Sequence, residues 1–229
     1  MKFGVVTFPG SNCDQDMIYV LKDMLGQQVE HLWHKDTDLK NVDMVIIPGG
    51  FSYGDYLRSG AIAKFSPIMT EVMRHAEKGG YVMGICNGFQ ILTESGLLEG
   101  ALLHNNTQKF ICKNVFLNPA SSSAAPSKDL TKNQAYKIPI AHGEGRFFAS
   151  DDTIKSIQDN DQILFHYCDE NGLVSDAANP NGSLNSIAGI SNKRKNVFGM
   201  MPHPERAADM HLGNKDGVAI FESILKHCS

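Results

Sequence analysis

Several features that mark other protein classes are missing from this chain. Its five cysteines are scattered, odd in number and never spaced as CxxC, which excludes a disulfide framework and a zinc knuckle. No apolar run is long enough for a membrane span, and the one in MKFGVVTFPG is too short for a signal peptide. There is no Lys/Arg cluster and the formal net charge is −4, which argues against nucleic acid or an anionic membrane as a partner. These absences predict a soluble, cytoplasmic protein.

The composition that remains is typical of a globular α/β protein. Hydrophobic residues make up 42% of the chain and charged residues 20%, and 229 residues can bury a sizeable core. There is no internal repeat and no linker that would separate two folding units. We therefore expect one domain over residues 1–229.

Apolar, β-branched runs alternate with helical patterns along much of the chain. Strands are predicted at residues 2–8, 28–33, 44–47, 81–85, 162–168, 187–190 and 197–201, and helices at 14–25, 61–78, 87–94, 150–158 and 215–227. This alternation predicts an α/β fold with a single doubly wound, mostly parallel sheet flanked by helices.

The stretch from about residue 107 to residue 140 breaks the alternation. Its centre, NPASSSAAPSKDLTKNQ, is polar, rich in small residues and contains proline. Such a composition predicts a long surface loop or a wide hairpin connection. A tolerated insertion is favoured over a functional loop.

Glycines flank Cys86 two residues away on either side, in the pattern Gly84-Ile85-Cys86-Asn87-Gly88. The G-x-C-x-G spacing has the layout of a nucleophile elbow, a tight strand-to-helix turn that projects its central side chain into a cleft. A helix starting at Asn87 would lower the pKa of the thiol and offer a backbone N–H to an oxyanion. The alternative is that Cys86 is a small buried hydrophobic residue.

Two further motifs follow predicted strands. In Met201-Pro202-His203-Pro204-Glu205 the prolines favour extended backbone, so His203 and Glu205 point to the same side and the carboxylate can orient the imidazole. Pro48-Gly49-Gly50 supplies backbone N–H groups unobstructed by a Cβ. Ligands of open α/β sheets bind beyond the carboxyl ends of the strands, so the three motifs are expected to converge there. Taken alone, His-Pro-Glu is more often a turn with a surface pair.

Together these residues resemble the class I glutamine amidotransferases, whose motifs G-x-C-x-G-x-Q and H-P-E stand here at residues 84–90 and 203–205. Longer segments are similar to one branch of that family, the glutaminase subunits of phosphoribosylformylglycinamidine synthase. They are FPGSNCDQD, PGGFSYGDYLRSGAIA, IPIAHGEGRF, ANPNGSLNSIAGI and MPHPERA, and they extend from end to end of the chain. The segment NPASSSAAPSKDLTKNQAYK departs from the family pattern.

The resemblance implies a flavodoxin-like fold and a role for each matching residue. Cys86 would be the nucleophile, His203 the base and then the acid, and Glu205 the residue that orients His203. The glutamine site would comprise the oxyanion-hole candidates Gly49, Gly50 and Asn87, together with Phe51, Gln90, His142 and Gly143.

The resemblance also implies partners. A glutaminase of this branch hydrolyses L-glutamine and passes ammonia to an ATP-dependent synthetase subunit (PurL), which makes formylglycinamidine ribonucleotide from formylglycinamide ribonucleotide in purine biosynthesis. In many bacteria a small subunit (PurS) bridges the two. The chain has no Walker A pattern, so we expect it to carry no cofactor and expect ATP and Mg²⁺ to be used by the synthetase.

Two other functions remain open from the sequence. A free-standing cysteine hydrolase, such as a γ-glutamyl peptidase or a DJ-1-like protein, would act without a partner. A catalytically silent regulatory domain is disfavoured because Cys86, His203 and Glu205 are all present.

Several other polar residues are predicted to have no catalytic role. His31 and His34 form an HxxH that is expected to be exposed rather than to bind metal, because no further ligands accompany it. The cysteines other than Cys86 lack a partner motif and are expected to be structural or incidental. For Asp55 and Arg58 an ion pair and an interface role are equally favoured.

Overall fold

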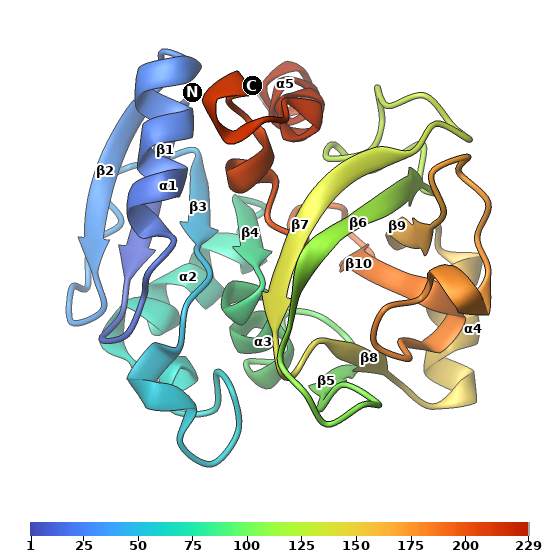
Figure 1. Cartoon of the computed structure of the whole chain (residues 1–229). Helices are drawn as coiled ribbons and strands as arrows, with labels where there is room; N and C mark the ends of the chain where they lie inside the picture. The colour runs from blue at the N-terminus through green and yellow to red at the C-terminus, as the bar shows by residue number, and fades with distance from the viewer. Residues whose placement is uncertain (229) are drawn as a thin grey trace.

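A computed structural model describes residues 1–228 and contains a nine-stranded sheet in the order β2-β1-β3-β4-β11-β10-β9-β6-β7 (Figure 1). Its parallel half consists of β1 (Lys2–Thr7), β2 (Gln28–Trp33), β3 (Met44–Ile47), β4 (Tyr81–Ile85) and β11 (Val197–Met200). Its antiparallel half consists of β10 (Ile187–Ser191), β9 (Ile163–Cys168), β6 (Ile111–Pro119) and β7 (Tyr136–His142). A separate pair joins β5 (Ala101–Leu103) to β8 (Arg146–Phe148).

Helices cover both faces of the parallel half, which confirms the predicted fold class. They are α1 (Asp14–Ile18), which continues as a π-helix over Tyr19–Met24, α2 (Pro67–Glu77), α3 (Asn87–Glu94), α4 (Asp151–Asp159) and α5 (Asp216–His227). In Figure 1, α1 lies in front of the sheet and α2 and α3 lie behind it. Short 3-10 turns lie at Ser52–Asp55, Ala63–Phe65, Asp176–Ala178, Leu184–Ser186, Pro204–Ala207 and Met210–Leu212.

The central strands form because their sequences are apolar on both faces. All four residues of β3 are buried, and so are all four of β11, as expected for strands covered by helices on each side. β4 lies between them, with Val82 opposite both Val45 and Val197. The carboxyl ends of three neighbouring parallel strands therefore meet at one edge of the sheet.

The predicted helix over residues 61–78 starts later than expected. A 3-10 turn at Ala63–Phe65 comes first, and α2 begins at Pro67. Proline lacks the N–H that a helix interior requires, but it suits the first helical position, where that N–H has no intrahelical partner. The prediction was therefore wrong for the residues before Pro67.

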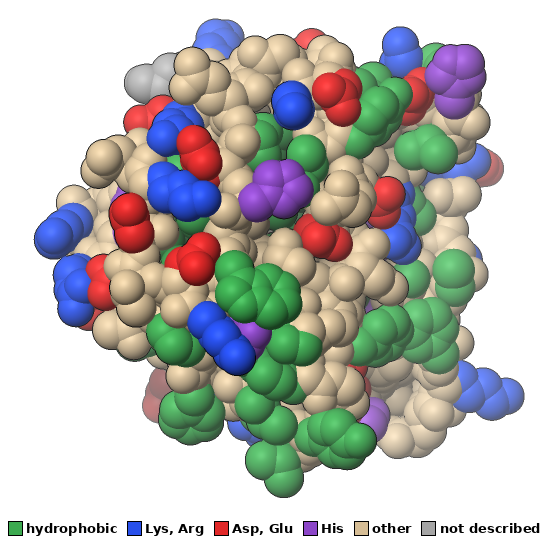
Figure 2. Space-filling view, turned by 90° about the vertical axis from the view of Figure 1, so that its left-hand side faces the viewer, with side chains coloured by type: hydrophobic (Ala, Val, Ile, Leu, Met, Phe, Trp, Pro, Cys, Tyr) green, Lys and Arg blue, Asp and Glu red, His purple; other side chains and the backbone are tan. Residues whose placement is uncertain are grey.

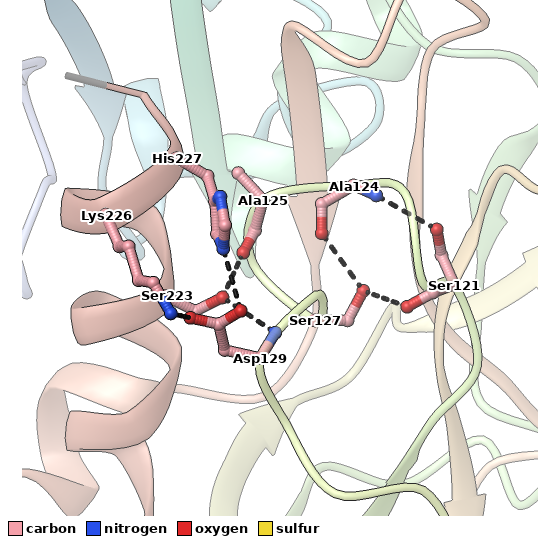
Figure 3. A network of polar contacts seen from close by, with 8 residues as sticks. All are labelled: Ser121, Ala124, Ala125, Ser127, Asp129, Ser223, Lys226 and His227. Carbon is pink, nitrogen blue, oxygen red and sulfur yellow. Dashed lines mark hydrogen bonds and ion pairs between the residues drawn. The ribbon is translucent and has the colours of Figure 1, made fainter.

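The connection from β6 to β7, residues 120–135, is the wide hairpin connection that the sequence allowed, but it is not a surface loop throughout. Ser121, Ala124, Ala125 and Ser127 are buried against the rest of the protein. Small side chains let this backbone pack closely, and each buried hydroxyl has a partner, as Figure 3 shows. The sequence also missed β6, whose first half is largely exposed and lacks a clear apolar run.

None of the helices in residues 1–228 is both long enough and apolar enough to cross a membrane.

Candidate active site

The three motifs that follow β3, β4 and β11 converge at one edge of the sheet, as predicted. Cys86 comes directly after β4, Gly49 and Gly50 follow β3, and His203 follows β11. These strands are adjacent and parallel, so their ends share one edge. The Gly49 backbone lies against the His203 ring, since a Cβ at Gly49 would come within 2.7 Å of Cε1.

Cys86 sits in a strained strand-to-helix turn. Its φ is 50° and its ψ is −106°, a backbone conformation that residues other than glycine rarely adopt. The flanking glycines are required by space: a Cβ at Gly88 would lie 1.9 Å from the Ile47 carbonyl oxygen, and one at Gly84 would lie 2.5 Å from the Gly88 backbone. The turn has the geometry of a nucleophile elbow, with Cys86 at the N-terminus of α3.

His203 and Glu205 form a buried pair. Nδ1 of His203 lies 2.7 Å from Oε1 of Glu205, and both side chains are almost wholly excluded from solvent. Burial opposes a charge on the imidazole, but the Glu205 carboxylate and the Cys86 thiolate outweigh it and raise the pKa of His203 well above its usual value. Because Nδ1 is occupied by Glu205, Nε2 is the atom available for proton transfer, and it has no hydrogen bond of normal geometry.

A second thiol, that of Cys13, also lies beside His203. The thiol of Cys13, a ring nitrogen of His203 and a carboxylate oxygen of Glu205 lie within 4.8 Å of one another, a grouping that could also hold a metal ion. Burial raises the pKa of Cys13, although its contact with His203 acts in the opposite direction. Sequence reasoning assigned Cys13 no functional role, and the one available signal was its place inside FPGSNCDQD.

Two small cavities meet at Cys86. One, of about 170 Å³, is lined by Cys86 together with Gly50, Phe51, Gln90, His142 and Gly143. The other, of about 150 Å³, is lined by Cys86, Cys13 and His203 together with Gly50 and Phe51. Most of the predicted glutamine-site residues therefore surround one thiol.

Asn87 and Gln90 lock the first turn of α3 to its surroundings. The buried Asn87 side chain accepts a hydrogen bond from the Ser52 backbone N–H (3.0 Å) and donates one to Oε1 of Gln90 (2.8 Å). The Gln90 amide in turn donates to the Glu144 carbonyl oxygen. These bonds fix the Gln90 side chain, which lines the larger cavity, in one orientation.

His142 is a buried neutral imidazole. The amide of Asn105 donates to the carbonyls of Lys109 (2.8 Å) and His142 (2.9 Å), so its Oδ1 must accept the proton from Nδ1 of His142 (3.0 Å). Burial, followed by the charge on His203, lowers the pKa of His142 to about 4. Its Nε2 is therefore a lone pair, and it has no partner.

The polar residues whose roles stayed open are now placed. Arg58 pairs with Glu94 at 2.6 Å, which matches the ion-pair alternative. Asp55 and Glu144 line the larger cavity with Cys86. The prediction that His34 is exposed was wrong, because its side chain is buried and its Nδ1 lies 2.6 Å from the Tyr53 hydroxyl.

Comparison with known proteins gives consistent matches. The family described as CobB/CobQ-like glutamine amidotransferase domain matches residues 1–217. A phosphoribosylformylglycinamidine synthase subunit PurQ from Trichormus variabilis is 55% identical over 226 residues, covering 99% of this chain and 97% of the relative. The PurQ subunit from Salinibacter ruber is 52% identical over 228 residues, covering 100% and 97%.

Solved structures agree with these sequence matches. The PurLQS structure from Thermotoga maritima contains a chain that superposes with a TM-score of 0.88 at 41% identity, covering 100% of this chain and 99% of that one. A glutamine amidotransferase from the same organism superposes with a TM-score of 0.57 at 13% identity, covering 99% and 84%. The second match speaks only to the fold.

Proposed function

Because the chain belongs to the CobB/CobQ-like glutamine amidotransferase family, and within it to the PurQ subunits of phosphoribosylformylglycinamidine synthase, we propose that it releases ammonia from glutamine at Cys86 with His203 and Glu205 as its catalytic partners. The observation that carries this proposal is the strained Cys86 elbow facing a buried imidazole whose far nitrogen is held by a carboxylate at 2.7 Å.

The reaction follows from what an amide requires. His203 Nε2 takes the proton of the Cys86 thiol, and the thiolate attacks the carboxamide carbon of glutamine. The backbone N–H groups of Gly50 and Asn87 would stabilise the oxyanion that forms. The His203 imidazolium then protonates the departing nitrogen, which leaves as ammonia, and a γ-glutamyl thioester remains on Cys86. A water molecule that gives its proton to His203 hydrolyses the thioester to glutamate.

Cys86 fits the role of nucleophile better than Cys13, although both thiols adjoin His203. Cys86 lies on the elbow at the N-terminus of a helix and borders both cavities, whereas Cys13 borders only the smaller one. Burial also raises the pKa of Cys13, which disfavours its thiolate.

We propose that the ammonia passes to a docked synthetase subunit of the PurL type. Ammonia in bulk water is protonated and no longer nucleophilic, so transfer requires a shielded route. Two side chains that line the larger cavity, Phe51 and Phe110, are exposed apolar rings. In the segment that follows Phe51, Tyr56, Leu57 and Phe65 are exposed as well. Figure 2 shows hydrophobic side chains gathered at the lower end of one face, at the height where Figure 1 places the loop before α2. Such a patch fits a protein partner.

The same proposal covers the other components. A small bridging subunit of the PurS type would join the assembly, since the solved relative is the PurLQS structure. ATP and Mg²⁺ would be used by the synthetase subunit, and this chain would need no cofactor. A cytoplasmic location fits the five cysteines, which are all free.

The test is glutamate release from glutamine by the purified chain, first alone and then with the synthetase subunit, formylglycinamide ribonucleotide, ATP and Mg²⁺. We expect slow release alone, a steep rise with the complete mixture, and no release by Cys86→Ala. High release that ignores the partner would instead indicate a free-standing hydrolase. Activity that survives Cys86→Ala would refute the mechanism.

A further inference from the structure

The proposed reaction leaves the thiol of Cys13, which lies beside His203, without a role. Cys13 directly precedes α1 and is 2% exposed. Its S–H donates a hydrogen bond to Oδ1 of Asn12 at 3.0 Å, which leaves the sulfur lone pairs to other contacts. A buried thiol of this kind becomes a ligand for a soft metal ion once its proton is lost.

The Cys13 thiol belongs to a cluster of three possible ligand atoms. Its Sγ, a ring nitrogen of His203 and a carboxylate oxygen of Glu205 lie within 4.8 Å of one another. Zinc bonds of about 2.0–2.3 Å place tetrahedral ligand atoms roughly 3.3–3.8 Å apart, so a contraction of no more than about 1.5 Å brings the three into range. Backbone bonds hold both segments, from the Cys13 N–H to the Gly49 carbonyl (3.2 Å) and from the His203 N–H to the Pro139 carbonyl (2.9 Å).

The cluster also contains buried atoms that the protein leaves unpaired. Oε1 of Glu205 holds Nδ1 of His203, but Oε2 is buried and has no hydrogen-bond partner within residues 1–228. Nε2 of His203 is buried as well and has no hydrogen bond of normal geometry. Leaving buried polar atoms unpaired costs free energy, which a bound cation would offset.

The smaller cavity gives an ion access to this cluster. Cys13 and His203 both line it, and its volume of about 150 Å³ exceeds the roughly 30 Å³ that one water molecule occupies. Arg206 also lines it, but its guanidinium is paired with Asp16 at 3.0 Å. A divalent ion between the Cys13 thiolate and the Glu205 carboxylate would balance two negative charges, so the buried group would be neutral.

We propose that Cys13, His203 and Glu205 form a binding site for a zinc-class ion, and that metal binding and glutamine hydrolysis exclude each other. Zinc accepts a thiolate, an imidazole and a carboxylate, whereas Mg²⁺ is bound through oxygen atoms. On binding, Cys13 loses its thiol proton and the ion replaces a proton on a nitrogen of His203.

The exclusion follows from the position of His203 in the catalytic chain. An ion on Nε2 removes the atom that takes the proton of Cys86, and an ion on Nδ1 displaces Glu205 from the imidazole. Either arrangement stops proton transfer, so the ion acts as an inhibitor and not as a cofactor. The metal site goes beyond the proposed function and depends on it only where the readout is activity.

The test is zinc binding by the purified, reduced full-length chain, measured in competition with a chromophoric chelator. Wild type should bind one equivalent, and Mg²⁺ in about 1,000-fold excess should not displace it. Cys13→Ser and Glu205→Gln should each weaken binding at least about 100-fold, because even changes outside the ligand shell cost 10–100-fold. With Co²⁺ as the probe, wild type should show a thiolate charge-transfer band that Cys13→Ser lacks.

Two further variants locate the ion. Cys112→Ser removes an exposed thiol of β6 and should leave the affinity for zinc unchanged. Cys86→Ser removes the nucleophile and should weaken binding by less than about tenfold, which is below the cost of losing a ligand. Circular dichroism checks that each variant is folded. Weak binding in Cys86→Ser together with full affinity in Cys13→Ser would place the ion on Cys86 and overturn the proposal, as would a wild type that binds no zinc.

Glutamate release by the assembled synthase then connects the site to catalysis. Without metal, Cys13→Ser should stay within about tenfold of wild type. The zinc concentration that halves the rate should be at least about 100-fold higher in Cys13→Ser, with the same synthetase preparation in both assays. Equal inhibition of the two proteins would overturn the mutual exclusion. A wild type that binds zinc but does not hydrolyse glutamine would refute the proposed function and leave the metal site intact.

Discussion

The active site and the 120–135 connection both bury polar side chains, but they treat them in opposite ways. In the connection, Ser121 donates to Asp161 (2.9 Å), Ser127 to the Ser121 carbonyl (2.9 Å), and Ser223 of α5 to the Ala125 carbonyl (2.6 Å). In the active site, by contrast, Nε2 of His142, Nε2 of His203 and Oε2 of Glu205 are buried without a hydrogen-bond partner.

The difference separates stability from function. Buried polar groups are normally paired, because an unpaired one costs about 1–3 kcal/mol. The connection follows that rule and serves the fold. The active site departs from it where a substrate or a transferred proton can supply the partner. The predictions below test whether changes in the two regions have separable effects.

Replacing Cys86 should have the largest effect. We expect Cys86→Ala to lower glutamate release at least ~10³-fold, because no other group forms the thioester. Cys13→Ala is the matched control, since it removes the other thiol beside His203, and it should lower release by less than about tenfold. Initial rates of the assembled synthase measure both. A loss of activity in Cys13→Ala as large as that in Cys86→Ala would contradict the assignment of Cys86 as the only essential thiol.

Weakening the buried pair should rank second. Glu205→Gln keeps the shape of the side chain but removes the carboxylate that raises the pKa of His203. We expect kcat to fall roughly 10²–10⁴-fold, by analogy with other triads whose acid is replaced by its amide. The measurement is kcat at saturating glutamine, with circular dichroism to confirm folding. A kcat within about threefold of wild type, which is a difference of about 0.6 kcal/mol in activation free energy, would show that Glu205 is not needed.

Removing a hydroxyl of α5 that binds the connection should affect only stability. Ser223→Ala loses the bond to the Ala125 carbonyl and the one from the Asp129 backbone N–H (Figure 3). We expect unfolding to become easier by about 1–3 kcal/mol, with kcat/KM unchanged. Thermal unfolding and steady-state kinetics on the same preparation test this separation. A selective fall in kcat/KM without a change in melting temperature would contradict it.

Replacing Asp55 should have the smallest effect, and it should stabilise the fold at pH 7 rather than destabilise it. Its pKa is raised to about 6, so the folded protein binds that proton more tightly than the unfolded chain does. The carboxyl therefore costs stability at pH 7, and this cost disappears as the pH falls toward about 4. We expect Asp55→Asn to be more stable at pH 7 by about 1 kcal/mol after allowance for partial exposure, and equal to wild type near pH 4. Chemical denaturation at both pH values measures this, and a variant less stable at pH 7 would refute it.

The sequence predicted the parallel half of the sheet well because its signals are local. β3 and β4 are short apolar runs closed by turn residues, and the expected bounds of both, and of the more polar β2, match the structure. The hairpin of β6 and β7 depends instead on pairing between strands separated by residues 120–135, and the exposed first half of β6 carries little pattern. The division into a single domain over residues 1–229 stays a prediction.

The site was predictable as far as its motifs extend. Cys86, His203 and Glu205 each belong to a short motif whose spacing has a structural reason. The fold brings the three residues together. Cys13, Asp55 and Glu144 have no such pattern, because their relevance comes from loops that meet only in three dimensions. Their one signal was membership of the longer segments that resemble the family.

The identity of the reacting thiol is the central claim, and covalent labelling tests it most directly. The assembled protein would be treated with a diazoketone analogue of glutamine. The attacking sulfur bonds to the protonated diazo carbon and N2 leaves, and the labelled peptide would be identified by mass spectrometry. The account predicts label on Cys86, blocked by excess glutamine, with Cys13 unlabelled. Label on Cys13, or on neither cysteine while activity is lost, would contradict it.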